Sequence, residues 1–284
     1  MIEDCPSATA LRIALQRAAH QVVDDPRIFD DPLALRILNL EAGAASGPDP
    51  GWPERTSASP RLRAFLAVRS RYAEDELHAA VKRGVRQYVV LGAGLDTFAC
   101  RNPYPEGVLR VFEVDHPATQ AWKRAQLEQA AIPIPPTLTF SPVNFETQTL
   151  EQGLLEAGFD MAANAYFSWL GVTQYLSVET VMAALGFVSS MPAGSSIVFD
   201  YTISPFLLGP GPRRAFDALV QRVARAGEPF RAFFDPSALK NDLAALGFTR
   251  IEDLSPEALN ARYFRERTDD LHVSGFTHVM NAGV

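Results

Sequence analysis

After Gly84 the chain alternates short apolar runs with longer segments that are polar or have helical spacing. Seven of these runs have the length and composition of β-strands: RQYVVLGAG, LRVFEVD, TLTFSPVNF, AYFSWLGV, SSIVFDYTI, FTRIEDL and GFTHVMNAG. Five are separated by segments long enough for crossover connections. Uninterrupted apolar runs such as YVVL are typical of parallel strands that are buried on both faces. The pattern therefore predicts an α/β protein built on a mostly parallel sheet.

Apolar residues at helical spacing occur before and between these strands. The predicted helices cover 7–20, 61–82, 118–130, 177–190 and 235–246, and a further short helix is predicted after Asp31, with Pro32 in its first turn. Ser177 and Asp235 are suited to be N-caps, and Gly247 is suited to end the last of these helices. The direction of the final strand does not follow from this pattern.

The segment 41–60, EAGAASGPDPGWPERTSASP, is dense in Gly, Pro and Ser, which is typical of a loop. We interpret it as a lid or entrance loop over a site. Residues 1–284 exceed the usual length of one domain, but α/β folds often reach it. We therefore expect a single domain. Its N-terminal part, 1–60, forms a helical cover with the lid loop, and 61–284 form the α/β core with a helical insertion near 205–234.

Composition and charge exclude several classes of protein. The chain is 47% hydrophobic and 21% charged, with a formal net charge of -7, and it has no Lys/Arg cluster of the kind that nucleic-acid binders need. Its partner is therefore expected to be a small molecule. Cys5 and Cys100 are too few for a disulfide framework, and no apolar run is long enough to span a bilayer. With no signal-peptide pattern at the N-terminus, we expect a cytoplasmic protein.

A glycine turn and an acid follow the first two predicted strands. Gly92, Ala93 and Gly94 come directly after YVVL, where small residues let backbone N–H groups approach a ligand closely. Asp115 ends the next strand, near the position where doubly wound folds place an acid on a ribose hydroxyl pair. The alternative reading of Asp115 is a cap or turn residue before Pro117.

The turn lacks one feature of dinucleotide sites. Thr97 stands where the third glycine of that fingerprint is required for close helix packing. A nucleoside ligand without a pyrophosphate, such as S-adenosylmethionine, demands less of this turn. Two alternatives stay open at this point, an NAD-dependent oxidoreductase and a non-catalytic cofactor-binding protein of the same fold.

Longer motifs carry a specific resemblance. The segments AVRSRYAED, VVLGAGLDTFACR, VFEVDHPATQAWKRAQL, PVNFE and FSWLGVTQYL together resemble the leucine carboxyl methyltransferase-like family of S-adenosylmethionine-dependent enzymes, from about Ser7 through the final strand. The resemblance implies a Rossmann-like class I methyltransferase fold with a seven-stranded sheet whose last strand is antiparallel, under an N-terminal helical cover. It also implies S-adenosyl-L-methionine as cofactor and S-adenosyl-L-homocysteine as product.

The resemblance assigns roles in cofactor binding. Arg69 looks like the family's arginine that holds the cofactor carboxylate, and Arg71 is the nearby alternative; a guanidinium pairs bidentately with a carboxylate. The Gly92, Ala93 and Gly94 turn would line the methionine and ribose portion, and Asp115 would accept from the ribose hydroxyls.

Two positions depart from the family pattern. Asn144 and Phe145 stand where members often have Asp and an apolar residue at the adenine contact, and Asn still offers a donor and an acceptor to the adenine edge. Leu170 stands where many members carry Glu, although its backbone could still touch the cofactor.

Methyl transfer is an in-line displacement that chiefly requires alignment and exclusion of water, so no catalytic residue is assigned. We expect O-methylation of a small organic acceptor, preferably a carboxylate, because an ionised carboxylate needs no general base whereas a phenol does. The side chains considered for the acceptor site are those of Arg17, His20, His116, Tyr72, Trp169, Tyr201 and Phe206. The alternative interpretation of the aromatic side chains is that they pack in the hydrophobic core. No cluster with metal-ligand spacing stands out, so no metal is expected, and the oligomeric state is not predicted.

Overall fold

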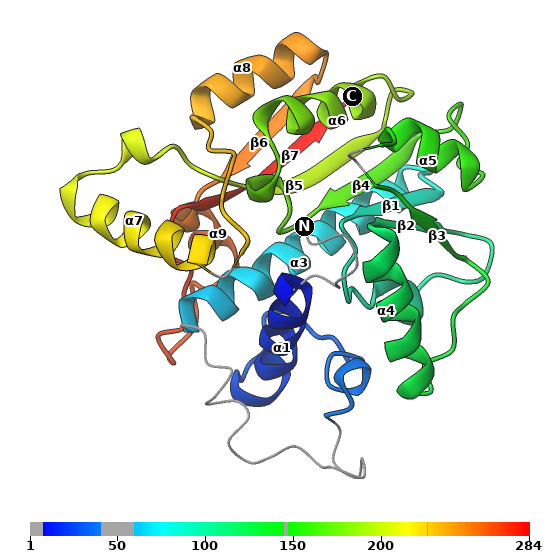
Figure 1. Ribbon diagram of the computed structural model, residues 1–284, viewed down its shortest axis with the longest axis horizontal. Coiled ribbons are helices and arrows are strands. Elements are labelled where there is room, and N and C mark those ends of the chain that lie inside the picture. The colour runs from blue at the N-terminus through cyan, green and yellow to red at the C-terminus, as the bar shows by residue number, and fades with distance from the viewer. Residues whose placement is uncertain (1–7, 41–59, 145–146, 226) are drawn as a thin grey trace.

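The computed structural model describes residues 8–40, 60–144, 147–225 and 227–284, and it contains one seven-stranded sheet with the order β3-β2-β1-β4-β5-β7-β6 (Figure 1). The strands are β1 Gln87–Leu91, β2 Arg110–Asp115, β3 Leu138–Pro142, β4 Ala165–Trp169, β5 Ser196–Thr202, β6 Arg250–Leu254 and β7 Thr277–Gly283. The first five pair in parallel, whereas β7 runs antiparallel to both β5 and β6. All seven predicted strands are confirmed, and so is the antiparallel last strand that the family resemblance implied.

Helices bury the sheet on both faces. Along β1, Tyr88 and Val90 point into a core shared with α3 (Pro60–Lys82) and α9 (Pro256–Tyr263). Val89 and Leu91 point into the opposite core, which contains α5 (Leu150–Glu156), α6 (Val178–Ser189) and α8 (Pro236–Leu246). Figure 1 shows α6 and α8 above the strands and α3 below them. Burial on both faces explains why β1 is apolar throughout rather than alternating.

The predicted helix ends agree with the observed caps. The side chain of Ser177 accepts a hydrogen bond from Thr180 N at the start of α6. Asp235 accepts from the backbone N–H groups of the first turn of α8, and Gly247 ends that helix with φ 106°, a left-handed value that glycine adopts without steric cost. Local cap chemistry was sufficient to place these boundaries.

The helix predicted after Asp31 is wrong. The segment forms turns and one short 3₁₀ helix, η1 (Arg36–Leu38), which ends at Asn39 with φ 55°. The reason is tertiary: Asp31 accepts from Leu33 N with one carboxylate oxygen, and its carboxylate also binds Thr97 and Arg17. These contacts with Asp31 hold the segment in a turn rather than in a helix.

The N-terminal cover consists of α1 (Ala8–Val23), which lies against α3, and of the turns that follow it (Figure 1). The helix α4 (Pro117–Gln129) follows β2, and α7 (Pro210–Arg225) lies inside the predicted insertion near 205–234. The predicted lid loop falls almost entirely on 41–59, outside the described residues. Among the helices of the described segments, none combines the length and apolar character needed to cross a membrane.

Candidate functional site

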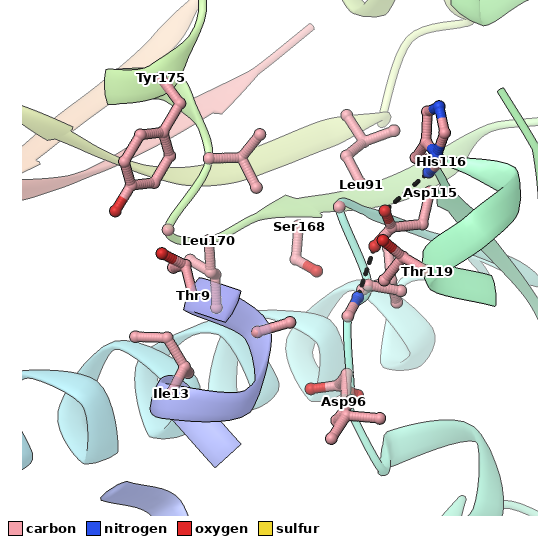
Figure 2. Close-up of a pocket in the computed structure, with 18 of the residues that line it drawn as sticks. Thr9, Ile13, Leu91, Asp96, Asp115, His116, Thr119, Ser168, Leu170 and Tyr175 are labelled. Atoms are coloured by element: carbon pink, nitrogen blue, oxygen red, sulfur yellow. Dashed lines mark hydrogen bonds between the residues drawn. The ribbon is translucent and has the colours of Figure 1, made fainter. Parts of the chain in front are cut away.

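A cavity of about 590 Å³ lies between α1 and the carboxyl ends of β1, β2 and β4. Its volume falls within the range of small-molecule sites, about 300 to 1,000 Å³. The walls come from segments far apart in sequence, namely α1, α3, the turn after β1, the end of β2, the loop after β4 and the loop 227–231. Figure 2 shows residues from α1, the turn after β1, the end of β2 and the loop after β4 around a common space.

Asp115, the last residue of β2, anchors the turn after β1. One of its carboxylate oxygens accepts from Gly94 N at 2.6 Å and the other from His116 N at 2.7 Å. Figure 2 shows both bonds on one side of the cavity. Burial raises the pKa of Asp115, while these two N–H groups act in the opposite direction. A carboxylate with free lone pairs is thereby fixed at the cavity wall.

The turn itself requires glycine. Gly92 and Gly94 have φ values of 64° and 49°, which side chains rarely adopt. A Cβ at Gly92 would lie 2.3 Å from Cγ2 of Val172, and one at Gly94 would lie 3.1 Å from Cβ of Ala10 on α1. Val172 and Ala10 therefore pack closely against the turn. Ala93, between the two glycines, also lines the cavity.

Arg69 lines the cavity from α3 and is held by Asp200 of β5. Its Nη1 donates to Asp200 Oδ2 at 2.6 Å, with side-chain exposures of 6% and 1%. The other Asp200 oxygen accepts from Gly171 N at 2.6 Å, and a Cβ at Gly171 would lie 2.8 Å from Arg69 Nη2. One buried carboxylate thus fixes both the arginine and the loop after β4.

The other predicted cofactor residues fall into three groups. Asn144 and Leu170 line the cavity, from the end of β3 and the end of β4. Phe145 lies outside the described residues. Arg71 does not line the cavity: it is half exposed and pairs with Asp75 at 2.9 Å. Arg71 is two residues from Arg69, and on a helix that spacing turns it to a different face.

Two predicted acceptor residues of the cover and α3 also lie away from the cavity. His20 is buried against Asp24, with Nδ1 to Oδ2 at 2.7 Å, and its Nε2 accepts from Ile28 N and Phe29 N. It therefore organises the turn after α1. The hydroxyl of Tyr72 donates to Glu252 at 2.8 Å, beside β6. Neither side chain lines the cavity.

Of the remaining aromatic candidates, Trp169 and Tyr201 pack in the core, whereas Phe206 does not. Trp169 packs in the core on the α6 side, because strand alternation turns it away from Ser168, which does line the cavity. Tyr201 is buried, and its hydroxyl donates to Asp253 at 2.9 Å. Phe206 is 89% exposed. The predicted aromatic wall does not form at the cavity.

Arg17 does line the cavity, but its charge is already paired. It donates to Asp31 at 2.5 Å and to Asp96 at 3.1 Å, and Thr97 bridges to the same Asp31 carboxylate. Asp31 belongs to the turns of the cover, whereas Asp96 and Thr97 belong to the loop after β1, so Arg17 joins the cover to the core through Asp96 and Thr97. Arg17 thus lines the cavity, and its role in orienting an acceptor carboxylate stays a prediction.

Several cavity residues were missed by sequence reasoning. They are Thr9, Ile13, Glu74, Asp96, Thr119, Ser168, Tyr175, Glu228 and Arg231. Asp96 had a signal, because it lies in the motif LGAGLDT, and Asp200 lies in the strand motif VFDY. Arg231 had none, since its loop has no periodic pattern and reaches the cavity only through the tertiary fold.

Comparison with known proteins gives the family. The leucine carboxyl methyltransferase profile matches residues 10–189. A Bacillus subtilis (strain 168) protein named "Putative S-adenosyl-L-methionine-dependent methyltransferase YktD" is 34% identical over 296 residues, covering 97% of each chain. Two solved structures share the fold. A DUF574 family protein from Streptomyces avermitilis matches with a TM-score of 0.53 and 15% sequence identity, over 88% of this chain and 96% of that one. A putative methyltransferase from Thermobifida fusca YX matches with a TM-score of 0.51 and 16% sequence identity, over 99% of this chain and 95% of that one. The chain therefore belongs to the leucine carboxyl methyltransferase family of S-adenosylmethionine-dependent methyltransferases.

Proposed function

We propose that this methyltransferase methylates an oxygen of a small organic acceptor, with a carboxylate preferred. The observation that carries the cofactor site is the Asp115 carboxylate, held by Gly94 N over a glycine turn at the cavity wall. Bound S-adenosylmethionine supplies the methyl group, and alignment and exclusion of water fall to this chain. A cytoplasmic location also remains part of the proposal.

The residues at the cavity fit the cofactor. Asp115 offers acceptor oxygens for a ribose diol, and Arg69 offers a guanidinium for the amino-acid carboxylate. The Gly92, Ala93 and Gly94 turn would lie along the methionine and ribose portion, with Asn144 and Leu170 near the adenine. Thr97, which replaces the third glycine of a dinucleotide site, is buried and hydrogen-bonded to Asp31. That contact also speaks against the NAD-dependent alternative.

A carboxylate acceptor is favoured because three side chains at the cavity that could accept a proton already have hydrogen-bond or ion-pair partners within the protein. His116 uses Nδ1 to accept from Ala118 N at the start of α4. Glu74 is paired with Arg101, and Asp96 with Arg17. An acceptor that is already ionised needs no proton acceptor, so these groups can keep their structural partners.

The product decides the acceptor class. With the purified enzyme and small acids and phenols as acceptors, mass spectrometry is expected to find a methyl ester that mild base hydrolyses. The rate should stay nearly flat from mildly acidic pH upward, because an unperturbed carboxyl group with a pKa of about 4 is already ionised there. A base-stable ether or an N-methyl product would overturn the proposal.

The cofactor site is tested by Asp115→Ala. We expect this variant to bind S-adenosylhomocysteine more weakly by about 1 to 3 kcal/mol, through loss of charge-assisted hydrogen bonds. Isothermal titration measures the affinity, and circular dichroism verifies folding. Asp75→Ala is the matched control, because that acid of α3 lies outside the cavity, where it is bonded to Arg71 and Tyr263. An unchanged affinity for S-adenosylhomocysteine in the folded Asp115→Ala variant would contradict the assignment of Asp115 to the cofactor site.

A further inference from the structure

Of the arginines that line the cavity within the described part of the chain, one has a charge that is not matched. These arginines are Arg17, Arg69 and Arg231. Arg17 is paired with Asp31 and Asp96, and Arg69 with Asp200. The guanidinium of Arg231 makes no hydrogen bond and no ion pair with any residue that the structure describes. Among the described arginines of the cavity, Arg231 is therefore the one whose whole guanidinium is left for a ligand, whereas Arg69 uses Nη1 for Asp200 and keeps its other donors for the proposed cofactor contact.

The backbone holds Arg231 at a defined place. Its N–H donates to the carbonyl oxygen of Gln174 at 2.7 Å, which joins the loop 227–231 to η3 (Thr173–Tyr175) after β4. Directly beside this bond, the rings of Tyr175 and Phe230 pack edge to face with centroids 5.5 Å apart. Two neighbouring contacts thus keep Arg231 next to Tyr175, although the arginine side chain is exposed.

Tyr175 adds a second polar group at the same end of the cavity. It lines the cavity, and its hydroxyl has no hydrogen-bond partner among the described residues. Figure 2 shows Tyr175 on the side of Thr9 and Ile13, across the cavity from Asp115 and His116. The proposed ribose contact and the Tyr175 end are therefore separate parts of one cavity.

Apolar side chains contribute to the wall of this cavity. Ile13 of α1 and Leu170, Val172 and Leu176 after β4 line it, and Thr9 adds a hydroxyl group near Ile13 at the Tyr175 end. The nearby acid, Glu228, accepts from Thr9 N at 3.4 Å and so closes the loop onto the start of α1; it forms no ion pair with Arg231. A cavity that offers apolar side chains together with a guanidinium and a phenol matches an acid with an apolar body rather than a neutral or cationic molecule.

We propose that Arg231 and Tyr175 form the subsite that binds the acceptor's carboxylate. This inference rests on the proposed O-methyltransferase function and names the residues that would select its substrate class. The guanidinium fork pairs with two carboxylate oxygens, and the Tyr175 hydroxyl donates a further hydrogen bond. The apolar side chains of the wall hold the rest of the acid. An uncharged amide of the same shape loses the ionic part of this recognition.

Binding of paired probes tests the subsite directly. Benzoate, phenylacetate and hexanoate, each beside its own amide, are titrated into the protein with and without S-adenosylhomocysteine. We expect at least one acid to bind about tenfold or more tightly than its amide. Arg231→Gln should remove that preference, Arg231→Lys should restore part of it, and Tyr175→Phe should reduce it. Arg225→Gln, on the exposed end of α7, is the matched control and should leave it unchanged.

The outcomes separate this inference from the proposed function. Affinity for S-adenosylhomocysteine should stay unchanged in Arg231→Gln, which shows that the cofactor part of the cavity is intact. Equal binding of every acid and its amide by the wild type, or an acid preference that survives in Arg231→Gln, would overturn the subsite whatever the cofactor does. Failure of the wild type to bind S-adenosylhomocysteine would instead count against the proposed function, while the titrations without it still decide the role of Arg231.

Discussion

Replacing Lys123 by Met is expected to lower the free energy of unfolding by about 3 to 5 kcal/mol. Lys123 of α4 donates to Glu113 of β2 at 2.5 Å, and both side chains are only 1% exposed. Burial raises the pKa of Glu113 even with Lys123 beside it, and its second carboxylate oxygen has no partner among the described residues. Without the lysine, this carboxylate is left uncompensated in the core.

Urea unfolding followed by circular dichroism measures the effect. The double variant Lys123→Met with Glu113→Leu should recover most of the loss, because replacing both partners removes the buried charge as well. Arg27→Met is the surface control: the Arg27–Asp30 pair is 49% and 71% exposed, and its loss should cost under about 1 kcal/mol. A Lys123→Met protein as stable as the control variant would show that this pair contributes little.

Asp200→Ala is expected to cost about 3 to 5 kcal/mol in stability and to weaken cofactor binding as well. The substitution leaves Arg69 without its buried partner and Gly171 N without its acceptor. Both the proposed carboxylate-binding arginine and the loop after β4 then lose their fixed positions. Asp200→Asn keeps one acceptor oxygen, and it serves as the milder variant should the alanine variant fail to fold.

Two ligands separate a positioning effect from general damage. S-adenosylhomocysteine carries the amino-acid carboxylate that Arg69 is proposed to hold, whereas 5′-methylthioadenosine lacks it. In Asp200→Asn, titration should show a weaker affinity for the first, by about tenfold, and a nearly unchanged affinity for the second. Equal losses for both ligands would contradict a role through Arg69, and Arg69→Met should reproduce the selective pattern.

Local rules were enough for the framework of this protein. The strands follow from their apolar runs, and the ends of α6 and α8 follow from Ser177, Asp235 and Gly247, because a cap depends on residues within one turn. The glycine turn and Asp115 were also found from sequence. Their spacing after two consecutive parallel strands brings them to the same edge of the sheet, and the structure joins them by a hydrogen bond of 2.6 Å.

The sequence by itself determined the seven strands, the caps and the Asp115 turn, whereas only the tertiary structure decided the order of the strands, which side chains line the cavity and which charges there are already paired. Asp31 and Asp96 neutralise Arg17, and Asp200 pairs with Arg69 across 131 positions of the chain. No periodicity encodes such a pairing. Arg231 reaches the cavity through an equally non-local contact with Gln174. Ion pairing and burial depend on distances in space, which the spacing of residues along a chain does not contain.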